Sequence, residues 1–298
     1  MTNAREDSFL GALLGLAIGD ALGRPLVGLT AAEIHARHGE VAGYVSDPGD
    51  EPETPPTGII TDETEVTLTI VESLTTNDGM LDPENINARL GFLIKGDSRR
   101  WMPDGVISGI QEATETDGLV PVTGDGEVDL SVAIRGVAVG LLHSLGARDD
   151  ETVRVDADLA SRLSHGGSAQ RLLTYEVALA TRAAALGETG AIVAIADRLN
   201  GSGAGSSFAS IVRGAAVVAQ FEDLVFAVVG EGGAADTRGA LAGALAGARF
   251  GASGIPQDLI DHLDARIYLS LAAPWFYRAA MRRAGMVIDL RNITQSEG

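Results

Sequence analysis

The chain has 298 residues, of which 45% are hydrophobic, so it can bury a sizeable core in one large domain or two small ones. Its 41 acidic and 22 basic residues give a formal net charge of −19, which should repel nucleic acid and anionic membranes. The absence of cysteine excludes disulfide bonds, thiolate metal sites and a cysteine nucleophile. The sequence shows no membrane-length apolar run and no basic secretion signal, so we expect a cytoplasmic protein that does not bind membranes.

The basic residues are almost entirely arginine, because Lys95 is the only lysine. An acidic, lysine-poor surface suits a salt-saturated cytoplasm, where carboxylates hold water and cations. A GC-rich genome would also deplete lysine. We interpret the composition as halophilic, with genome composition as the alternative.

Apolar residues recur every three or four positions along most of the chain, which predicts helices. Short apolar runs such as 225–229 are too few for a sheet protein, and no repeat or linker divides the chain. The sequence therefore predicts one all-α domain over residues 1–298, a compact orthogonal array of many helices with a frayed tail at 291–298. The predicted helices cover residues 8–23, 64–76, 84–95, 105–116, 131–146, 168–186, 208–219 and 221–229, and a central helix that begins near 236 and ends at 251–257.

The central helix carries glycine at every fourth position, at 239, 243, 247 and 251. A glycine costs a helix about 1 kcal/mol relative to alanine, so a glycine face indicates that another backbone approaches closely there. The helix follows Gly232–Thr237, and its first turn holds Asp236 and Thr237. These two residues either cap the helix or present oxygens to a hard cation.

A second oxygen-rich cluster, Thr61–Glu65, precedes another helical pattern far upstream. Taken alone, each cluster is an ordinary helix cap. Together they could share one divalent cation, because Mg²⁺ and related ions prefer carboxylate and hydroxyl oxygens.

These stretches, read together, resemble the ADP-ribosylglycohydrolase family over nearly the whole chain. That family has T-D-D-T-E, G-G-D-A-D-T and G-D-A-L-G motifs, an S/T-H pair and a loop ending in M-R. The resemblance implies an all-α fold with two Mg²⁺ or Mn²⁺ ions between the acidic clusters. The matching segments here are Thr61-Asp62-Glu63-Thr64, Gly232–Thr237, Gly19-Asp20-Ala21-Leu22-Gly23, Ser164-His165 and Ile134-Arg135.

Carried over by position, the resemblance implies that Asp62 and Glu63 are catalytic and that a metal-dependent reaction cleaves an ADP-ribosyl or related ribosyl bond. The substrate would be a small molecule or an ADP-ribosylated protein, and the oligomeric state is left open. The implied metal ligands are Thr61, Asp62, Glu63, Asp236 and Thr237.

Four further residues are expected to contact the substrate: Ser164, His165, Gly126 and Asp97. For His165 the alternative is a histidine without a ligand role. For Asp97 the alternative is an ion pair with Arg99 or Arg100. The segment around Gly126 lacks the D-x-D-x-D-G register and distal glutamate of a calcium loop.

The chain departs from the family motifs at several positions. Glu63 replaces an aspartate, Ala234 stands where the family has the first aspartate of G-G-D-A-D-T, and Val27 stands where a glutamate is common. The ligand loop is also altered, with Leu130 inside it. One metal ion should therefore bind firmly and a second weakly or not at all. Two classes of function remain: a hydrolase, or a catalytically degenerate protein that binds a nucleotide or ADP-ribose or has a structural role.

The halophilic interpretation predicts that thermal stability rises with salt well into the molar range, because ions screen repulsion among the surface carboxylates. Melting curves from dilute buffer to molar KCl would measure this. A melting temperature that does not change over that range would reject the interpretation.

Overall fold

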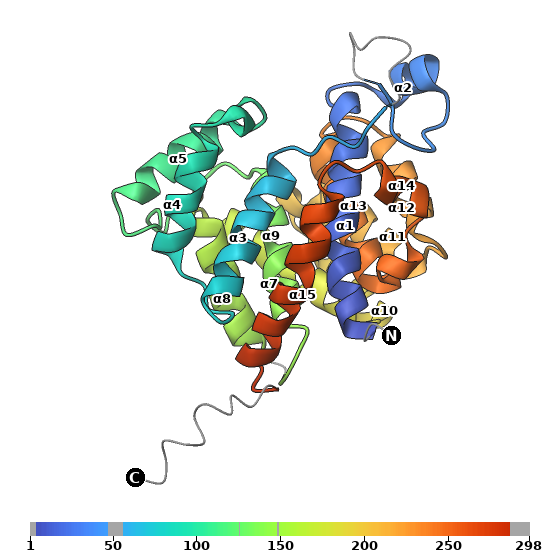
Figure 1. Ribbon diagram of the computed structural model, residues 1–298. Coiled ribbons are helices and arrows are strands. Elements are labelled where there is room, and N and C mark those ends of the chain that lie inside the picture. The colour runs from blue at the N-terminus through green and yellow to red at the C-terminus, as the bar shows by residue number, and fades with distance from the viewer. Residues whose placement is uncertain (1–3, 47–55, 125, 148, 287–298) are drawn as a thin grey trace, which may run out of the picture.

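The computed structural model describes residues 4–46, 56–124, 126–147 and 149–286. The predicted frayed tail at 291–298 lies outside these residues, as does most of the Pro-rich loop before Thr61. The described part of the chain has no β-strand, only isolated bridges. The prediction of an all-α fold is confirmed (Figure 1).

The helices follow one another through the whole chain, with short 3-10 turns between some of them. In the first half they are α1 Ala4–Gly23, η1 Arg24–Leu26, α2 Ala31–His38, α3 Asp62–Thr76, α4 Pro83–Leu93, η2 Asp97–Arg100, α5 Asp104–Thr114, α6 Leu130–Ile134 and α7 Gly136–Leu142. In the second half they are α8 Asp150–Arg162, α9 Ser168–Leu186, α10 Thr189–Gly201, η3 Gly203–Gly205, α11 Ser206–Val217, α12 Phe221–Val229, α13 Ala235–Phe250, η4 Ala252–Gly254, α14 Gln257–Asp261 and α15 Arg266–Arg283.

Helices α1 and α13 form the centre of the molecule and run side by side in opposite directions (Figure 1). Each has small residues at every fourth position, and these positions face one another. A Cβ added at any of these glycines would lie closer than 3.0 Å to backbone atoms of the opposite helix. The predicted close backbone approach is confirmed, and its partner is the glycine face of α1. The facing positions are Gly11 with Gly247, Gly15 with Gly243, Gly19 with Gly239, and Gly23 with Ala235.

The remaining helices pack around this pair. Helices α9, α11 and α12 contact α13, while α15 lies against α1 and α3. The stretch Ala4–Leu26 is apolar and long enough to cross a membrane by length and composition, but 83% of its most apolar window is buried inside the protein. Its apolar character is therefore explained by its place in the core.

The predicted helix at 131–146 is instead two short helices, α6 and α7, that meet at Arg135. The Arg135 side chain is buried and donates from Nη1 to the carbonyl oxygens of Ala160, at 3.1 Å, and Ser161, at 3.4 Å. A buried guanidinium needs such acceptors, and the break in the helix lies at the residue that reaches them.

Helices α2, α8, α10, α14 and α15 lie outside the predicted ranges. A capping box between Thr30 and Glu33 starts α2 and was overlooked. Helix α15 contains Pro274 and exposes apolar side chains on its outer face as well as burying them on its inner one, so its sequence lacks a clean amphipathic period.

The α1–α13 contact predicts a sharp difference between two glycine-to-alanine substitutions. Gly243→Ala should lower the free energy of unfolding by about 1–3 kcal/mol, because the new methyl group would overlap the backbone of Gly15. Gly91→Ala is the matched control, since a Cβ at this α4 position meets no atom within 4 Å and alanine favours the helix. Chemical denaturation would compare the two, and equal stabilities would contradict the proposed packing constraint.

Candidate active site

The antiparallel pairing of α1 and α13 brings the end of one helix to the start of the other. Gly23 faces Ala235, so Asp20 of α1 lies near Asp236 and Thr237 at the start of α13. The start of α3, with Thr61 and Asp62, lies against the same two helices. Three helix ends thus meet at one acidic cluster, which we define as Asp20, Thr61, Asp62, Glu63, Thr64, Asp236 and Thr237.

Asp20 is fully buried and organises the upstream part of the acidic cluster. One carboxylate oxygen accepts the backbone N–H of Thr61 at 2.9 Å and the hydroxyl of Thr64 at 2.5 Å. The other accepts the Thr61 hydroxyl at 2.7 Å. In the sequence, Asp20 was noted only as part of the G-D-A-L-G motif. In the structure, its hydrogen bonds with Thr61 and Thr64 hold the start of α3 in place.

Glu63 joins the two sequence motifs. Its Oε2 lies 2.5 Å from the hydroxyl oxygen of Thr61, and its Oε1 accepts the hydroxyl of Thr237 at 2.6 Å. Asp236 accepts the backbone N–H of Thr237 at 2.7 Å. The structure therefore brings together the five residues predicted as metal ligands, while their binding of a metal stays a prediction.

The carboxyl groups of the acidic cluster all have raised pKa values, chiefly because burial disfavours their charged forms. Burial and repulsion by Glu63 raise the pKa of Asp20 well above its usual range. Burial, then Glu63 and Asp20, raise the pKa of Asp62 to about 9. The pKa of Glu63 is raised by burial and by Asp236, and that of Asp236 by burial. The cluster therefore favours an added positive charge.

The donor set fits a hard divalent cation, since it consists of carboxylate and hydroxyl oxygens. A threonine hydroxyl that donates to Glu63 keeps lone pairs free for a cation. Within the ranges that the structure describes, no three His, Cys, Asp or Glu side chains are already arranged as a metal site.

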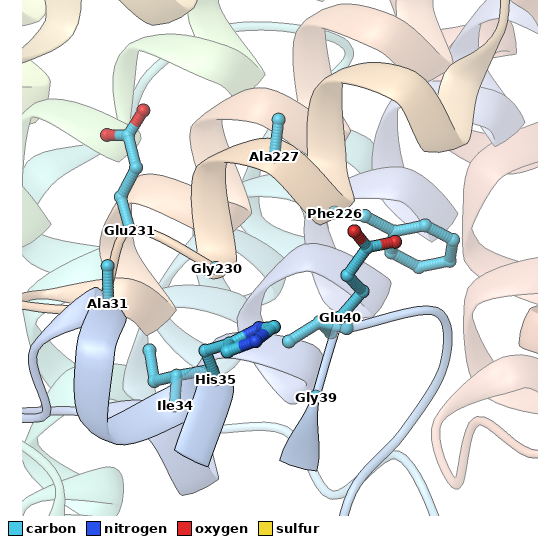
Figure 2. Close-up of a pocket in the computed structure, with 10 residues that line it drawn as sticks. Ala31, Ile34, His35, Gly39, Glu40, Phe226, Ala227, Gly230 and Glu231 are labelled. Atoms are coloured by element: carbon cyan, nitrogen blue, oxygen red, sulfur yellow. The ribbon is translucent and has the colours of Figure 1, made fainter. Parts of the chain in front are cut away.

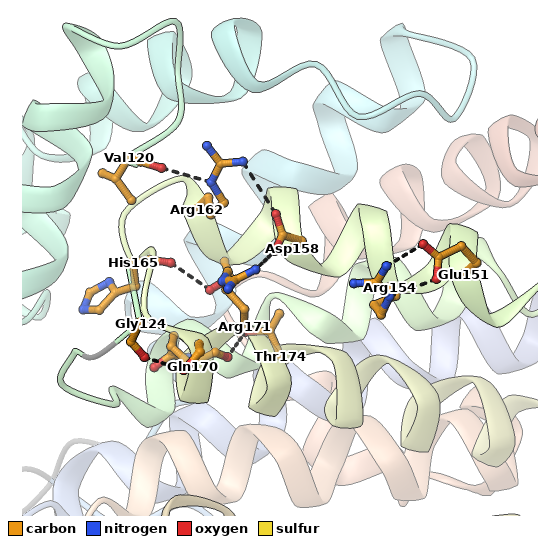
Figure 3. Close-up of polar contacts among 12 residues, drawn as sticks. Val120, Gly124, Glu151, Arg154, Asp158, Arg162, His165, Gln170, Arg171 and Thr174 are labelled. Atoms are coloured by element: carbon orange, nitrogen blue, oxygen red, sulfur yellow. Dashed lines mark hydrogen bonds and ion pairs between the residues drawn. The ribbon is translucent and has the colours of Figure 1, made fainter. Parts of the chain in front are cut away.

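Ser164 and His165 lie in the turn between α8 and α9. Figure 3 shows His165 in this turn. His165 is half-buried, and its Nδ1 is 2.9 Å from the Ser164 hydroxyl. The Ser161 hydroxyl donates to the carbonyl of His165 at 3.0 Å, and the backbone N–H of Thr123 donates to that of Gly166 at 2.9 Å. Burial, and then Arg135, lower the pKa of His165, which favours the neutral imidazole.

Polar contacts on the solvent side of the same turn hold it further. Arg162 donates to the carbonyl of Val120 at 3.0 Å and pairs with Asp158, which also pairs with Arg171 (Figure 3). These contacts fix α8 and the start of α9 on either side of the turn.

Arg135 lies between the acidic cluster and the His165 turn. Burial lowers its pKa to about 10, against the opposing effect of Asp129 and Asp62. Its Nη1 holds the last turn of α8, which leads into Ser164, while its Nε is buried without a hydrogen-bond partner. The sequence marked Arg135 as part of a motif but did not show that it is the buried cation beside the acids.

Gly126 and Asp97 lie at the edges of the site. A Cβ on Gly126 would lie 3.3 Å from Gly167 Cα, so this loop passes close to the His165 turn. Asp97 is exposed in η2, which contacts α3, and forms no ion pair with Arg99 or Arg100. Neither placement tests substrate contact, so the four predicted substrate residues remain predictions.

Two of the positions that depart from the family motifs, Ala234 and Val27, are exposed, whereas Glu63 is buried and Leu130 packs against the core. Ala234 is exposed at the start of α13, where no side chain caps the helix. Val27 is 48% exposed just after η1. Leu130 is half-buried as the first residue of α6.

A surface pocket of about 430 Å³ lies between α2 and the end of α12, lined in part by His35, Glu40, Phe226 and Glu231 (Figure 2). None of the predicted site residues lines it. The predicted metal ligands lie in the acidic cluster and not in this pocket, so the acidic cluster is the candidate active site.

The fold is thus all-α, with an acidic, hydroxyl-rich cluster at the meeting point of three helices. A model of the ADP-ribosylglycohydrolase family matches residues 1–285, so the chain belongs to that family. This confirms the predicted family and the expectation of a hydrolase.

Two relatives are each 30% identical to the chain. The ADP-ribosyl-[dinitrogen reductase] glycohydrolase of Rhodospirillum rubrum aligns over 280 residues, 88% of this chain and 92% of the relative. An uncharacterized protein of Archaeoglobus fulgidus aligns over 169 residues, 55% of this chain, so the chain spans about half (51%) of that relative. A solved structure, described as an ADP-ribosylglycohydrolase-related protein complex, is similar with a TM-score of 0.75 and 26% identity, covering 93% of this chain and 99% of its own.

The raised pKa of Asp62 predicts a pH-dependent stability in protein treated with a chelator. The folded chain holds a proton on Asp62 up to about pH 9, whereas the unfolded chain releases it near 3.8, so stability should fall as the pH rises between these values. Asp62→Asn should raise the melting temperature at pH 8 by about 5 °C, and the difference should vanish towards pH 4. Glu84→Gln, an exposed carboxyl in α4, is the control. Equal pH profiles for Asp62→Asn and the parent would contradict the buried-acid assignment.

Proposed function

We propose that this protein is a metal-dependent hydrolase that cleaves the glycosidic bond of an ADP-ribosyl group or a related ribosyl group. The observation that carries the proposal is the bridge made by Glu63 between Thr61 and Thr237. It places two oxygen-rich motifs, far apart in sequence, at one buried cluster of acids. The substrate class follows from the family and is a small molecule or an ADP-ribosylated protein.

The residues that would hold the metal are Thr61, Asp62, Glu63, Asp236 and Thr237. Mg²⁺ or Mn²⁺ suits their oxygens, with one ion bound firmly and a second weakly or not at all because Ala234 offers no carboxylate. A bound ion would polarise the anomeric centre and lower the pKa of a water molecule.

The protein's own groups would orient the sugar and handle protons. Asp62 and Glu63 have raised pKa values, which favours their protonated forms and suits a general acid role. Ser164, His165, Gly126 and Asp97 would contact the substrate. Arg135 would hold the His165 turn in register with the acids.

The alternative function is that of a catalytically degenerate relative that binds a nucleotide or ADP-ribose or has a structural role. Ala234 favours it, because this exposed position beside Asp236 lacks the carboxylate of the family motif. Val27 and Leu130 favour it too. Under either function we propose a cytoplasmic, salt-adapted protein that does not bind nucleic acid or membranes, as its charge of −19 and lack of cysteine suggest.

The proposal predicts that Mg²⁺ or Mn²⁺ raises the melting temperature by several degrees, because the ion binds only the folded chain. Asp236→Ala should abolish that rise, whereas the control Glu84→Ala should keep it. Hydrolysis of ADP-ribosyl-arginine at high salt should depend on the same ion. A metal response that survives in Asp236→Ala would contradict the shared site.

Ala234→Asp separates the two functions. It should tighten metal binding, because a carboxylate is added beside Asp236, and it should raise hydrolysis if metal occupancy limits the reaction. Tighter metal binding without hydrolysis would favour the degenerate binder. Unchanged metal binding would show that residue 234 does not face the ion.

A further inference from the structure

A surface pocket of about 460 Å³ lies along α3 and is also lined by residues of α4 and of the start of α15. Figure 1 shows α3 between α4 and α15, and both neighbours contact it. Apolar side chains form much of the pocket wall: Ile60, Leu68, Leu93 and Ala265. Ile60 immediately precedes Thr61, but among the described residues none from the acidic cluster lines the pocket. It is therefore a separate site.

Glu65 of α3 contributes a carboxylate to this wall, and we call the cavity the Glu65 pocket. The Oε2 atom of Glu65 is buried and has no hydrogen-bond partner within the described ranges. Thr69, one helical turn further on, donates its hydroxyl to the backbone carbonyl of Glu65 at 2.8 Å, so it does not satisfy the carboxylate. A buried carboxylate oxygen without a donor costs free energy, so this position favours a ligand that brings N–H groups and a positive charge.

The second carboxylate in the lining, Glu72, already holds a guanidinium. Arg89 donates from Nη1 to Glu72 Oε2 at 2.8 Å, and Tyr268 donates its hydroxyl to Glu72 Oε1. The Nε of Arg89 donates to Asn85 Oδ1 at 2.9 Å, so this guanidinium is held in place on α4 and is not available to Glu65. Two carboxylates and one guanidinium leave one formal negative charge of the lining uncompensated.

Two aromatic rings at the pocket are unusually accessible. The side chain of Phe92 is 76% exposed and that of Tyr268 is 45% exposed, and both line the pocket. A guanidinium stacks on aromatic faces and pairs with a carboxylate through a planar fork of N–H groups, whereas an ammonium is a compact and strongly hydrated point charge. A divalent metal ion needs several oxygen ligands. One unpartnered carboxylate oxygen among apolar and aromatic walls therefore favours a guanidinium.

We propose that the Glu65 pocket binds a guanidinium group carried on an aliphatic stem. The guanidinium donates to the Glu65 carboxylate and stacks on the ring of Phe92 or Tyr268, and the stem lies against Leu68 and Leu93. The ligand is a free guanidino compound or the arginine side chain of another protein, since both present the same chemistry. The inference does not rest on the proposed hydrolysis, because the pocket and the acidic cluster share no residue.

Calorimetric titration of the chelator-treated full chain with N-acetylarginine amide tests the proposal. In molar KCl, attraction to the acidic surface is screened, while contact with a partly buried carboxylate is weakened less. The parent should bind this probe at least about tenfold more tightly than N-acetylcitrulline amide, its uncharged analogue, because the pairing with Glu65 is charge-assisted. Glu65→Gln should weaken binding of the arginine probe by about tenfold or more for the same reason. Glu84→Gln, at an exposed carboxyl of α4, is the matched control and should bind like the parent.

A second variant separates the Glu65 pocket from the acidic cluster, whose carboxyl groups could also attract a cation. Asp236→Asn alters the cluster and not the pocket, so it should keep the arginine probe bound. Circular dichroism melting shows whether each variant is folded. A parent that does not bind the probe, or that binds it no better than folded Glu65→Gln does, would overturn the site. Binding that is lost in folded Asp236→Asn and kept in Glu65→Gln would also overturn it, because the probe would then lie in the acidic cluster.

Free arginine as a second probe distinguishes the two sources of the ligand. Its binding to the parent is compared with that of N-acetylarginine amide under the same conditions. Tighter binding of free arginine supports a free guanidino compound as the ligand. Equal or weaker binding supports an arginine side chain within a protein, whose backbone the capped probe imitates.

Discussion

The close approach of α1 and α13 is the constraint on which the rest of the structure depends. Their backbones touch through small residues at every fourth position, so neither helix can shift or rotate without a clash. This fixed pair sets Asp20 beside Asp236 and Thr237, and Asp20 in turn fixes the start of α3 through Thr61 and Thr64. The geometry of the acidic cluster therefore depends on glycines that carry no functional side chain and act only through helix packing.

Without a bound cation, the acidic cluster lowers the stability of the folded protein. Four carboxyl groups lie within it, largely buried, and Arg135 is the buried cation beside them in the described part of the chain. Burial destabilises the ionised form of these carboxyl groups, and repulsion between neighbouring carboxylates adds to this effect at Asp20 and Asp62, so their pKa values are raised. A protein that needed only a stable core would place apolar or neutral side chains here, which supports the proposed cation site.

Sequence patterns predicted what depends on local spacing and missed what depends on long-range contacts. The glycine period of α13 predicted a close partner, but nothing local identified that partner as α1. The break at Arg135 depends on the carbonyls of Ala160 and Ser161, which are distant in sequence, so apolar spacing predicted one continuous helix. The five residues expected to bind metal were predicted from a resemblance; the structure brings them together, and their binding of a metal stays a prediction. The role of Asp20 in fixing the start of α3 could not be predicted, because it depends on hydrogen bonds from Thr61 and Thr64, which are distant in sequence.

The departure at Ala234 can be understood from the same electrostatics. A carboxylate at this position would add a fifth acid beside Asp236, whose pKa is already raised. An aspartate at this exposed N-cap position would also cap the start of α13, so the stability of the helix does not explain the alanine. An alanine there is consistent with a site adapted to one ion: it removes the acid that a second ion would have neutralised and keeps the residues that a single ion would use. In a protein that binds no ion, an alanine at position 234 would have no effect on function. Ala234 is therefore informative about the number of bound ions only because the chain retains the four largely buried carboxyl groups of the acidic cluster.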